Sequence, residues 1–239
     1  MLVDDVMAAA GELGALSEAE AVARIQSRYT EVCDRIQAHC GGRPVEVVAM
    51  TKGFGPRLVE LAVQAGLTTL GENYAQELVS KATDPELASY HSEINWHFVG
   101  GLQRNKIKKL VGLVDVWESI DRLDLIDELA KRDPGARLLL QVNTTDEPQK
   151  SGCTPQDLPT LLERADERGL AVEGLMTVGP TDPAIDARPS FVRLRELAQR
   201  HELAQLSMGM SGDYDIAVAE GATIVRVGSV LFGARPIRG

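Results

Sequence analysis

Lys52 stands where a charged residue is least expected, directly behind an apolar run. In VEVVAM, residues 45–50, five of the six residues are apolar, which is typical of a buried strand, and lysine is among the residues least often buried. A partly desolvated lysine has a lowered pKa, so its neutral amine can attack an aldehyde and form a Schiff base. A lone lysine at such a place is better explained by a side chain that reaches solvent or pairs with Glu72.

Two segments near the other end of the chain, LSMGMSGD and VRVGSVLFGAR, have the features of anion-binding turns. Ser211 and Gly212 follow one apolar run, and Gly228 with Ser229 follows the next. Hydroxyls, free backbone N–H groups and helix N-termini at such turns bind anions, and glycine allows close approach. A tight strand-to-helix turn explains either segment alone, but the two together favour a phosphate site.

Further polar residues follow two other apolar runs. Glu72 and Asn73 lie in GENYAQE and Gln103 in GGLQRNK, where they can orient a ligand, although residues in such loops often cap helices or order turns instead. His97, within NWHFVG, is expected to be a hydrogen-bonded core residue rather than a general base. The basic segment QRNKIKK, residues 103–109, is expected to be the solvated side of a helix.

The elements that must position these residues alternate along the chain. Ser17 and Glu20 form a capping-box pattern that begins a long amphipathic helix ending before Gly41. Eight short apolar runs then alternate with helical patterns, which predicts parallel strands joined by crossover helices. We expect an α/β fold, a (β/α)8 TIM barrel with an extra N-terminal helix. A doubly wound open sheet is the alternative, but no GxGxxG segment follows the first strand.

Composition narrows the class of protein. The 239 residues carry a formal charge of −10, which argues against binding to a nucleic acid backbone. The three cysteines show no disulfide framework and no zinc-binding pair, so we expect reduced thiols and no metal site. No apolar run approaches the roughly 20 residues of a membrane span, and the N-terminus lacks the pattern of a leader. We therefore expect a cytoplasmic protein that does not bind membranes.

These motifs together resemble one family. MTKGFGP, GENYAQE, WHFVGGLQRNK, VNTTDEPQKSG, GLMTVG and the long C-terminal stretch from LSMGMSGD to LFGAR are similar, in this order, to the pyridoxal 5'-phosphate homeostasis proteins of the YggS or PROSC type. That family is related to the N-terminal barrel of alanine racemase. The resemblance implies a single pyridoxal-phosphate-binding barrel domain over residues 1–239, with residues 1–42 as a helical extension packed on it. Gly53 and Gly101 depart from residues common in the family.

The resemblance also implies a cofactor site. Pyridoxal 5'-phosphate, a form of vitamin B6, would be held as a Schiff base on Lys52, with Arg226 facing its pyridine nitrogen. The other residues implied to bind it are Asn73, Met176, Ser207, Ser211, Gly228 and Ser229. Arginine does not give up its proton at physiological pH, so Arg226 would leave the pyridine nitrogen unprotonated and weaken the ring as an electron sink.

The function expected from the resemblance is intracellular pyridoxal phosphate homeostasis, by buffering and delivery of the cofactor, with little or no catalysis. PLP-dependent apoenzymes are the expected recipients, and the chain is expected to be a monomer. The alternative is a weak amino-acid racemase with Lys52 as sole base, because the sequence ends at Gly239 without the domain that supplies the second base of alanine racemase. A cofactor-free Schiff-base aldolase is a third hypothesis. Lys150, after the fifth apolar run, is a second candidate for covalent attachment.

Overall fold

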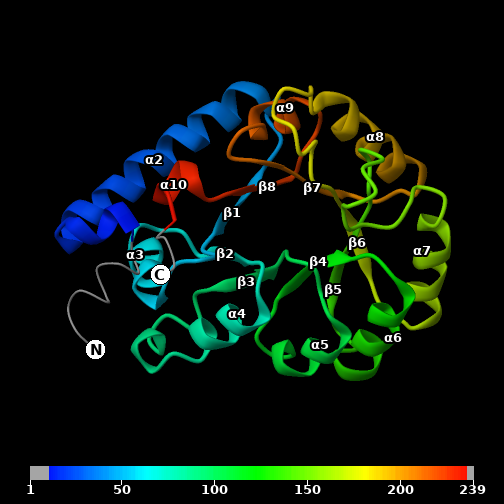
Figure 1. The fold of residues 1–239 in the computed structure, drawn as a ribbon, viewed down its shortest axis with the longest axis horizontal. Coiled ribbons are helices and arrows are strands. Elements are labelled where there is room, and N and C mark those ends of the chain that lie inside the picture. Colours follow the sequence, from blue (N-terminus) through cyan, green and yellow to red (C-terminus); the bar gives the residue numbers. More distant parts are fainter. Residues whose placement is uncertain (1–10, 236–239) are drawn as a thin grey trace.

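Strand order and strand direction define the architecture. The computed structural model describes residues 11–235, in which eight strands close into a barrel in the order of the sequence. Every neighbouring pair is parallel, including β1 with β8. A helix follows each strand, and the helices form a ring outside the barrel (Figure 1). The predicted (β/α)8 barrel is confirmed, and the doubly wound sheet is wrong because the strand order closes.

The elements have the following bounds. The strands are β1 Glu46–Met50, β2 Thr69–Glu72, β3 Asn95–Phe98, β4 Val116–Ile120, β5 Arg137–Gln141, β6 Val172–Met176, β7 Gln205–Met210 and β8 Ile224–Val227. The α-helices are α2 Glu18–His39, α3 Pro56–Gln64, α4 Ala75–Ala82, α5 Arg104–Leu110, α6 Leu123–Arg132, α7 Leu158–Glu167, α8 Arg188–Arg200, α9 Tyr214–Ala219 and α10 Ser229–Phe232. Two short 3-10 helices are η1 Gly11–Ala15 and η2 Pro85–Leu87.

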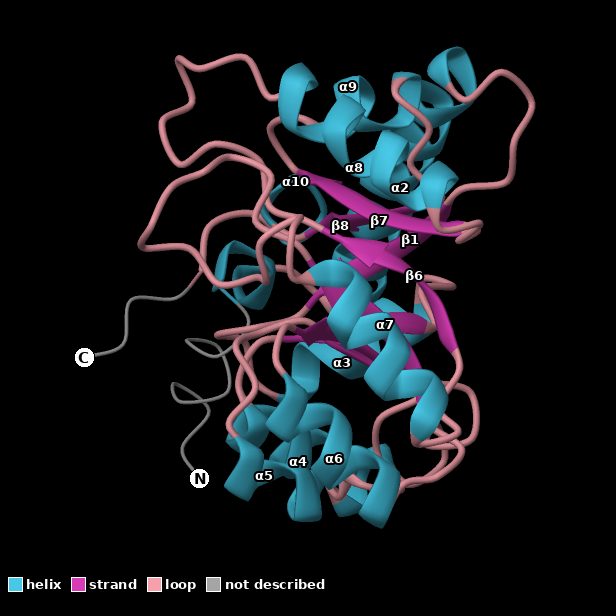
Figure 2. Cartoon of the chain, turned by 90° about the vertical axis from the view of Figure 1, so that its right-hand side faces the viewer, coloured by secondary structure: helices cyan, strands magenta, loops and turns pink. Residues whose placement is uncertain are grey.

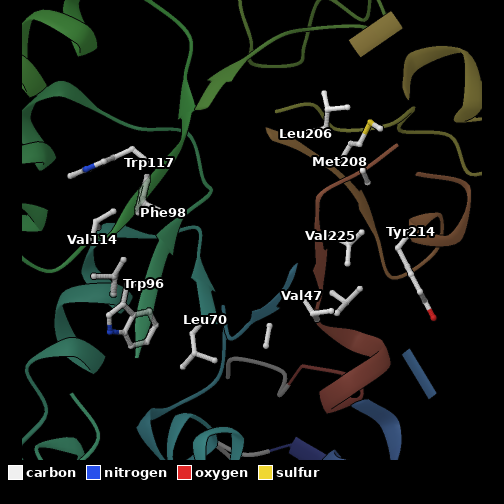
Figure 3. Packing of buried hydrophobic residues seen from close by; sticks show 14 of the residues in the cluster. Val47, Leu70, Trp96, Phe98, Val114, Trp117, Leu206, Met208, Tyr214 and Val225 are labelled. Carbon is white, nitrogen blue, oxygen red and sulfur yellow. The ribbon is translucent and has the colours of Figure 1, made fainter. Parts of the chain in front are cut away.

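Side chains alternate between the two faces of each strand, and this alternation produces two apolar layers. The larger layer lies between the barrel and the helices and contains outward side chains such as Trp96, Trp117 and Val225 (Figure 3). The smaller layer fills the barrel interior. It consists of Val48, Met50, Val116, Leu139, Met176 and Ile224. These residues give an inward position in β1, β6 and β8, the strands that lead to Lys52 and carry Met176 and Arg226.

Helix α2 completes the ring of helices. Its N-terminus has the predicted capping box, in which the Ser17 hydroxyl accepts from the Glu20 N–H and the Glu20 carboxylate accepts from the Ser17 N–H. Its apolar face, which includes Ile25 and Val32, is buried, and the helix contacts α3, α9 and α10 (Figure 1). Helix α10, which follows the eighth strand, spans only Ser229–Phe232 and is too short to cover the outside of β8 and β1. Helix α2 packs beside it and covers this part of the barrel. Residues 1–10 of the predicted extension lie outside the described residues.

The longer loops gather at one side of the barrel, where α10 follows β8 (Figure 2). This is the side at which the strands end, and in barrels of this type it carries the functional site. The three cysteines are unpaired, and burial raises the pKa of Cys153 to about 12, which keeps that thiol protonated. Within residues 11–235, no helix has both the length and the hydropathy to cross a membrane.

Candidate functional site

A cavity of about 610 Å³ opens at the carboxyl ends of the strands. Its lining brings together most of the residues singled out in the sequence, from segments that lie far apart in the chain. These residues are Lys52, Asn73, Ser211, Gly212, Arg226, Gly228 and Ser229. Met176 and Ser207 do not line it, because both are buried inside the barrel, at 1% and 0% exposure. The cavity therefore brings these seven residues together, while Met176 and Ser207 lie in the barrel interior.

Lys52 enters the cavity because of its place in the strand alternation. Val48 and Met50 belong to the interior layer, and Lys52 continues the same face two residues beyond Met50. Desolvation, followed by repulsion from Arg235 and Arg226, lowers the pKa of Lys52 below its ordinary value. A larger fraction of the amine is therefore neutral near pH 7 than for a lysine in water, and the neutral amine is the form that attacks an aldehyde.

Arg226 crosses the floor of the cavity and is held from two sides. Its Nη1 donates to Ser207 Oγ over 2.6 Å, and its Nη2 donates to the Thr177 carbonyl oxygen over 2.7 Å. The side chain is 3% exposed, and burial lowers its pKa, an effect that Glu118 and Asp213 oppose. A guanidinium has five N–H donors, so donors remain for a group in the cavity.

A buried polar chain lies beneath Arg226. Ser207 accepts from Arg226 and donates to Glu118 Oε2, and the other Glu118 oxygen lies 2.6 Å from His97 Nδ1. Desolvation raises the pKa of Glu118, but hydrogen bonds and charge from His97, followed by Arg226 and Ser207, outweigh it and leave the pKa below its ordinary value. Glu118 is thus the counter-ion of Arg226, at 3.9 Å, and His97 is the hydrogen-bonded core residue predicted from the sequence.

The loops after β7 and β8 meet at the cavity. Ser211 Oγ accepts from the Gly228 N–H over 3.2 Å, which fixes the two loops against each other. A Cβ at Gly228 would lie 3.2 Å from the carbonyl oxygen of Met50, a tight contact that would require β1 or β8 to shift by a few tenths of an ångström. The hydroxyls of Ser211 and Ser229 thereby share one wall of the cavity, as expected for an anion site.

Glu72 and Gln103 do not line this cavity. Glu72 lies behind the barrel wall, where it pairs with Lys81 and not with Lys52, because its position in β2 points outward toward α4. Gln103 lines a smaller neighbouring cavity of about 360 Å³, which shares Asn73 with the first. Of the polar residues at the ends of β2 and β3, Asn73 therefore lines both cavities and Gln103 lines only the smaller one. Glu72 lies outside the barrel against α4.

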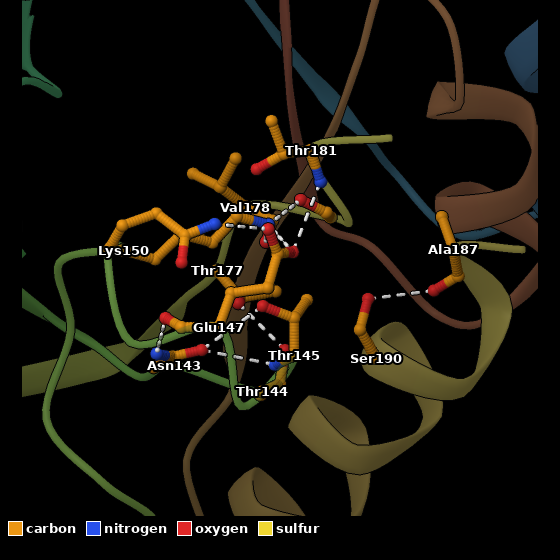
Figure 4. A network of polar contacts seen from close by, with 12 residues as sticks. Asn143, Thr144, Thr145, Glu147, Lys150, Thr177, Val178, Thr181, Ala187 and Ser190 are labelled. Atoms are coloured by element: carbon orange, nitrogen blue, oxygen red, sulfur yellow. Dashed lines mark hydrogen bonds and ion pairs between the residues drawn. The ribbon is translucent and has the colours of Figure 1, made fainter. Parts of the chain in front are cut away.

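Lys150 is also outside the main cavity lining. Its Nζ donates to the Gly179 carbonyl oxygen and lies 2.7 Å from Glu147 Oε1 (Figure 4). Hydrogen bonds from Lys150 and Thr181 lower the pKa of Glu147 to about 2, so this carboxylate is ionised at neutral pH. Lys150 thus tethers the loop after β5 to the loop after β6 and is less available for attachment than Lys52.

Arg235 is a cavity residue that the sequence reasoning missed. It lies in the loop after α10 and lines the cavity, with its side chain near Gly53. Its signal was the FGAR segment, which follows the eighth strand at the end of the short helix α10 and so returns to the end of the barrel that carries Lys52. With Lys52 and Arg226 it makes the lining cationic, and no acidic side chain belongs to the lining within residues 11–235.

Replacing Arg235 by alanine is expected to raise the pKa of Lys52 toward its ordinary value, because one repelling charge is removed. A smaller fraction of neutral amine should then slow labelling of Lys52 by an amine-reactive reagent at pH 7 and move the pH profile of labelling to higher pH. Mass spectrometry of the Lys52 peptide measures both. An unchanged profile would contradict the electrostatic role of Arg235, and Arg235→Lys, which keeps the charge, is the matched control.

A second variant tests the loop that carries Asn73. A Cβ at Gly100 would lie 2.0 Å from the Asn73 carbonyl oxygen, whereas a Cβ at Gly101 would meet nothing within 4 Å. Gly100→Ala is expected to displace the Asn73 loop and to lower the free energy of unfolding by about 1–3 kcal/mol, as overpacking does. Gly101→Ala should stay within about 0.5 kcal/mol of wild type. Urea denaturation measures both, and equal effects at the two positions would contradict the close contact.

A (β/α)8 barrel whose cavity contains a lysine directly after β1 and an arginine on β8 defines a class of protein. The family model described as alanine racemase, N-terminal domain, matches residues 26–236. The pyridoxal phosphate homeostasis protein of Aquifex aeolicus is 36% identical over 232 residues, covering 92% of this chain and 99% of the relative. That of Pseudomonas aeruginosa is 39% identical over 228 residues, covering 91% and 95%.

A solved structure has the same fold. PipY of Synechococcus elongatus, with pyridoxal phosphate bound, superposes with a TM-score of 0.73 at 30% identity, covering 87% of this chain and 100% of PipY. The chain therefore belongs to the pyridoxal phosphate homeostasis protein family, as the resemblance of its motifs indicated.

Proposed function

We propose that this protein binds pyridoxal 5'-phosphate covalently on Lys52 and acts in intracellular homeostasis of the cofactor, by buffering and delivery, with little or no catalysis. The observation that carries the proposal is the single cavity in which Lys52, Arg226 and the serine-containing loops after β7 and β8 meet. The relatives from Aquifex aeolicus and Pseudomonas aeruginosa are named pyridoxal phosphate homeostasis proteins, and the PipY structure contains bound pyridoxal phosphate.

The donor set of the cavity fits the chemical groups of the cofactor. Pyridoxal phosphate supplies an aldehyde that condenses with amines and a pyridine ring that accepts electrons. The amine with the lowered pKa, Lys52, suits the aldehyde, and the hydroxyls of Ser211 and Ser229 suit the phosphate. Three cationic side chains and no carboxylate in the described lining favour an anion, although the whole chain carries a charge of −10.

Two features favour storage over turnover. Arg226 is held by Ser207 and Thr177 with its charge balanced by Glu118, so it would offer the pyridine nitrogen a hydrogen bond without releasing a proton. The ring is then a weak electron sink. Lys52 is also the one residue in the described cavity lining that can exchange a proton with a substrate, because no His, Cys, Tyr, Asp or Glu from residues 11–235 belongs to that lining. Two-base racemisation lacks a second partner there.

Absorption spectroscopy tests the binding. Addition of pyridoxal phosphate to the pure protein should give a band near the visible edge that disappears on borohydride reduction, with the label on Lys52 by peptide mass spectrometry. If the reduced cofactor is found on another residue, or on none, the result contradicts the proposal. The label on Lys52 together with a requirement for the phosphate-bearing cofactor also excludes a cofactor-free aldolase.

Chiral chromatography tests the absence of turnover. The loaded protein is incubated with L-alanine and with D-alanine, and the other enantiomer is quantified. We expect conversion far below the roughly 1 to 1,000 per second of ordinary enzymes. Conversion within that range would favour the racemase instead. The cytoplasmic location, the monomeric state and delivery to apoenzymes stay predictions, which fractionation, light scattering and transfer assays address.

A further inference from the structure

Helix α4 holds the backbone on both sides of Lys52. Lys81 Nζ donates to the Thr51 carbonyl oxygen over 2.8 Å, and the Gly53 N–H donates to Glu77 Oε2 over 2.7 Å. The Thr51 carbonyl belongs to the peptide unit before Lys52, and the Gly53 N–H belongs to the unit after it. Fixing both units fixes φ and ψ of Lys52, since only these two dihedrals separate adjacent peptide planes.

The two side chains that make these hydrogen bonds, Glu77 and Lys81, lie one turn apart on α4. Glu77 and Lys81 are four residues apart, on the same face of the helix, with 3.9 Å between Lys81 Nζ and Glu77 Oε2. Gly53 has φ +81°, a left-handed conformation that places the chain in a sharp turn directly after Lys52. The contacts from α4 hold this turn at the point where the strand ends and the cavity begins.

Behind this contact lies a buried ion pair. Lys81 is 2% exposed and Glu72 is 0% exposed, with Lys81 Nζ 2.5 Å from Glu72 Oε1. The same oxygen accepts from Thr51 Oγ1 over 2.6 Å, while Glu72 Oε2 is buried without a hydrogen-bond partner among the described residues. Desolvation raises the pKa of Glu72, and Lys81 and Thr51 oppose it.

Stability is a weak reason for such a pair. Apolar replacement of a buried ion pair is often neutral or stabilising, because desolvation of the two charges offsets their attraction. An apolar pair could fill the space between β2 and α4, but it could not donate a hydrogen bond to the Thr51 carbonyl. The distinctive contribution of Lys81 is this hydrogen bond.

We propose that Lys81 and Glu77 are positioning residues for Lys52, which fix its backbone from α4 and so hold its amine inside the cavity, with Glu72 as the buried support of Lys81. The inference rests on the proposed attachment of pyridoxal phosphate to Lys52. Without these contacts the side chain samples orientations outside the cavity, where its ammonium is better solvated. The Lys52 amine then loses its orientation toward the cavity and also the desolvation that lowers its pKa.

The Glu77 variants give the cleanest test. Glu77→Leu removes the acceptor of the Gly53 N–H, whereas Glu77→Gln keeps an oxygen acceptor at the same distance along the side chain. The rate of borohydride-trapped addition of pyridoxal phosphate to Lys52 is expected to fall about three- to tenfold in Glu77→Leu, the cost of ordering one long side chain. Glu77→Gln should restore most of the rate. Equal losses in both variants would overturn the proposal.

A second measurement does not depend on the cofactor. Labelling of Lys52 by trinitrobenzenesulfonate in the ligand-free protein is followed against pH by mass spectrometry of the Lys52 peptide. The profile is expected to move to higher pH in Glu77→Leu and in the double variant Glu72→Gln/Lys81→Met. Desolvation is the largest influence on the pKa of Lys52, so solvation of the released amine should exceed the loss of the Glu72 charge, which raises that pKa. Thermal unfolding is recorded for each variant, and Ser80→Ala, on the exposed face of α4, is the matched control.

The outcomes separate the two proposals. If wild type adds no pyridoxal phosphate but the labelling profiles move as expected, the proposed function fails and the positioning role stands. If wild type adds the cofactor and neither Glu77→Leu nor the double variant changes the addition rate or the labelling profile, the positioning role is overturned. Should the double variant fail to fold, the comparison of Glu77→Leu with Glu77→Gln decides alone.

Discussion

The Lys52→Ala variant is expected to lose the borohydride-stable adduct with pyridoxal phosphate completely, while wild type forms a stoichiometric one. Lys52 is the one lysine in the cavity lining within residues 11–235, so no other amine there can take its place. Arg226 and the loops after β7 and β8 remain, and the cofactor should still bind without a covalent bond, weaker by at least about tenfold, equivalent to 1.4 kcal/mol. Absorption spectra, reduction and peptide mapping measure the adduct, and equilibrium dialysis measures the affinity.

Two other lysines serve as matched controls for this variant. Lys150→Ala removes a lysine held by Glu147 and Gly179, and Lys106→Ala removes one that lines the neighbouring cavity. Both should keep the stoichiometric adduct on Lys52. An adduct that persists in Lys52→Ala and maps to Lys150 would contradict the assignment and make Lys150 the attachment site or a second one.

The barrel was predictable because its determinants are local. Short apolar runs, which form strands of four to six residues, alternate with amphipathic segments, and eight parallel strands joined by helices are the number that a closed (β/α)8 barrel contains. Strand alternation also places Lys52 and Arg226 on the inner face, since each lies an even number of residues from an interior apolar side chain, Met50 and Ile224. The resemblance to a family then added roles that local patterns do not define.

The partners of these residues were not predictable, because they depend on the register between strands far apart in the sequence. Glu72 was one alternative partner for Lys52, but it faces outward and pairs with Lys81, nine positions further along the chain on α4. Ser207 was expected in the cavity, and it lies below, between Arg226 and Glu118. Glu118 carries no signal in its own segment, VDVWESI, because its partners come from β3, β7 and β8.

The Glu118→Leu variant is expected to lower the free energy of unfolding by about 3–5 kcal/mol, the cost of leaving a buried charge without its partner. The charge is that of Arg226, 3.9 Å from the Glu118 carboxylate and 3% exposed. For a domain of this size the melting temperature should fall by on the order of 10 °C. Glu118→Gln keeps acceptor and donor atoms near His97 and Ser207, and it should lose less stability than Glu118→Leu.

The pH dependence of unfolding gives an independent signature of Glu118. Its pKa is lower in the folded protein than in the unfolded chain, so its carboxylate contributes stability above the unfolded pKa, about 4.3, and this contribution is lost as the pH falls through the folded pKa. Both Glu118 variants should therefore lose less stability than wild type between neutral and acidic pH. Urea denaturation at a series of pH values measures the difference.

The double variant Glu118→Leu/Arg226→Met distinguishes pairing from general packing. If the loss in Glu118→Leu comes from the uncompensated guanidinium, removing Arg226 as well should recover part of it, with a coupling of about 0.5–3 kcal/mol between the two sites. Additive losses would show that Glu118 stabilises the barrel through His97 and Ser207 alone. Recovered stability without recovered cofactor affinity would separate the two proposed roles of Arg226, because cofactor binding is expected to need its guanidinium, whereas folding is expected to need only that its charge be balanced.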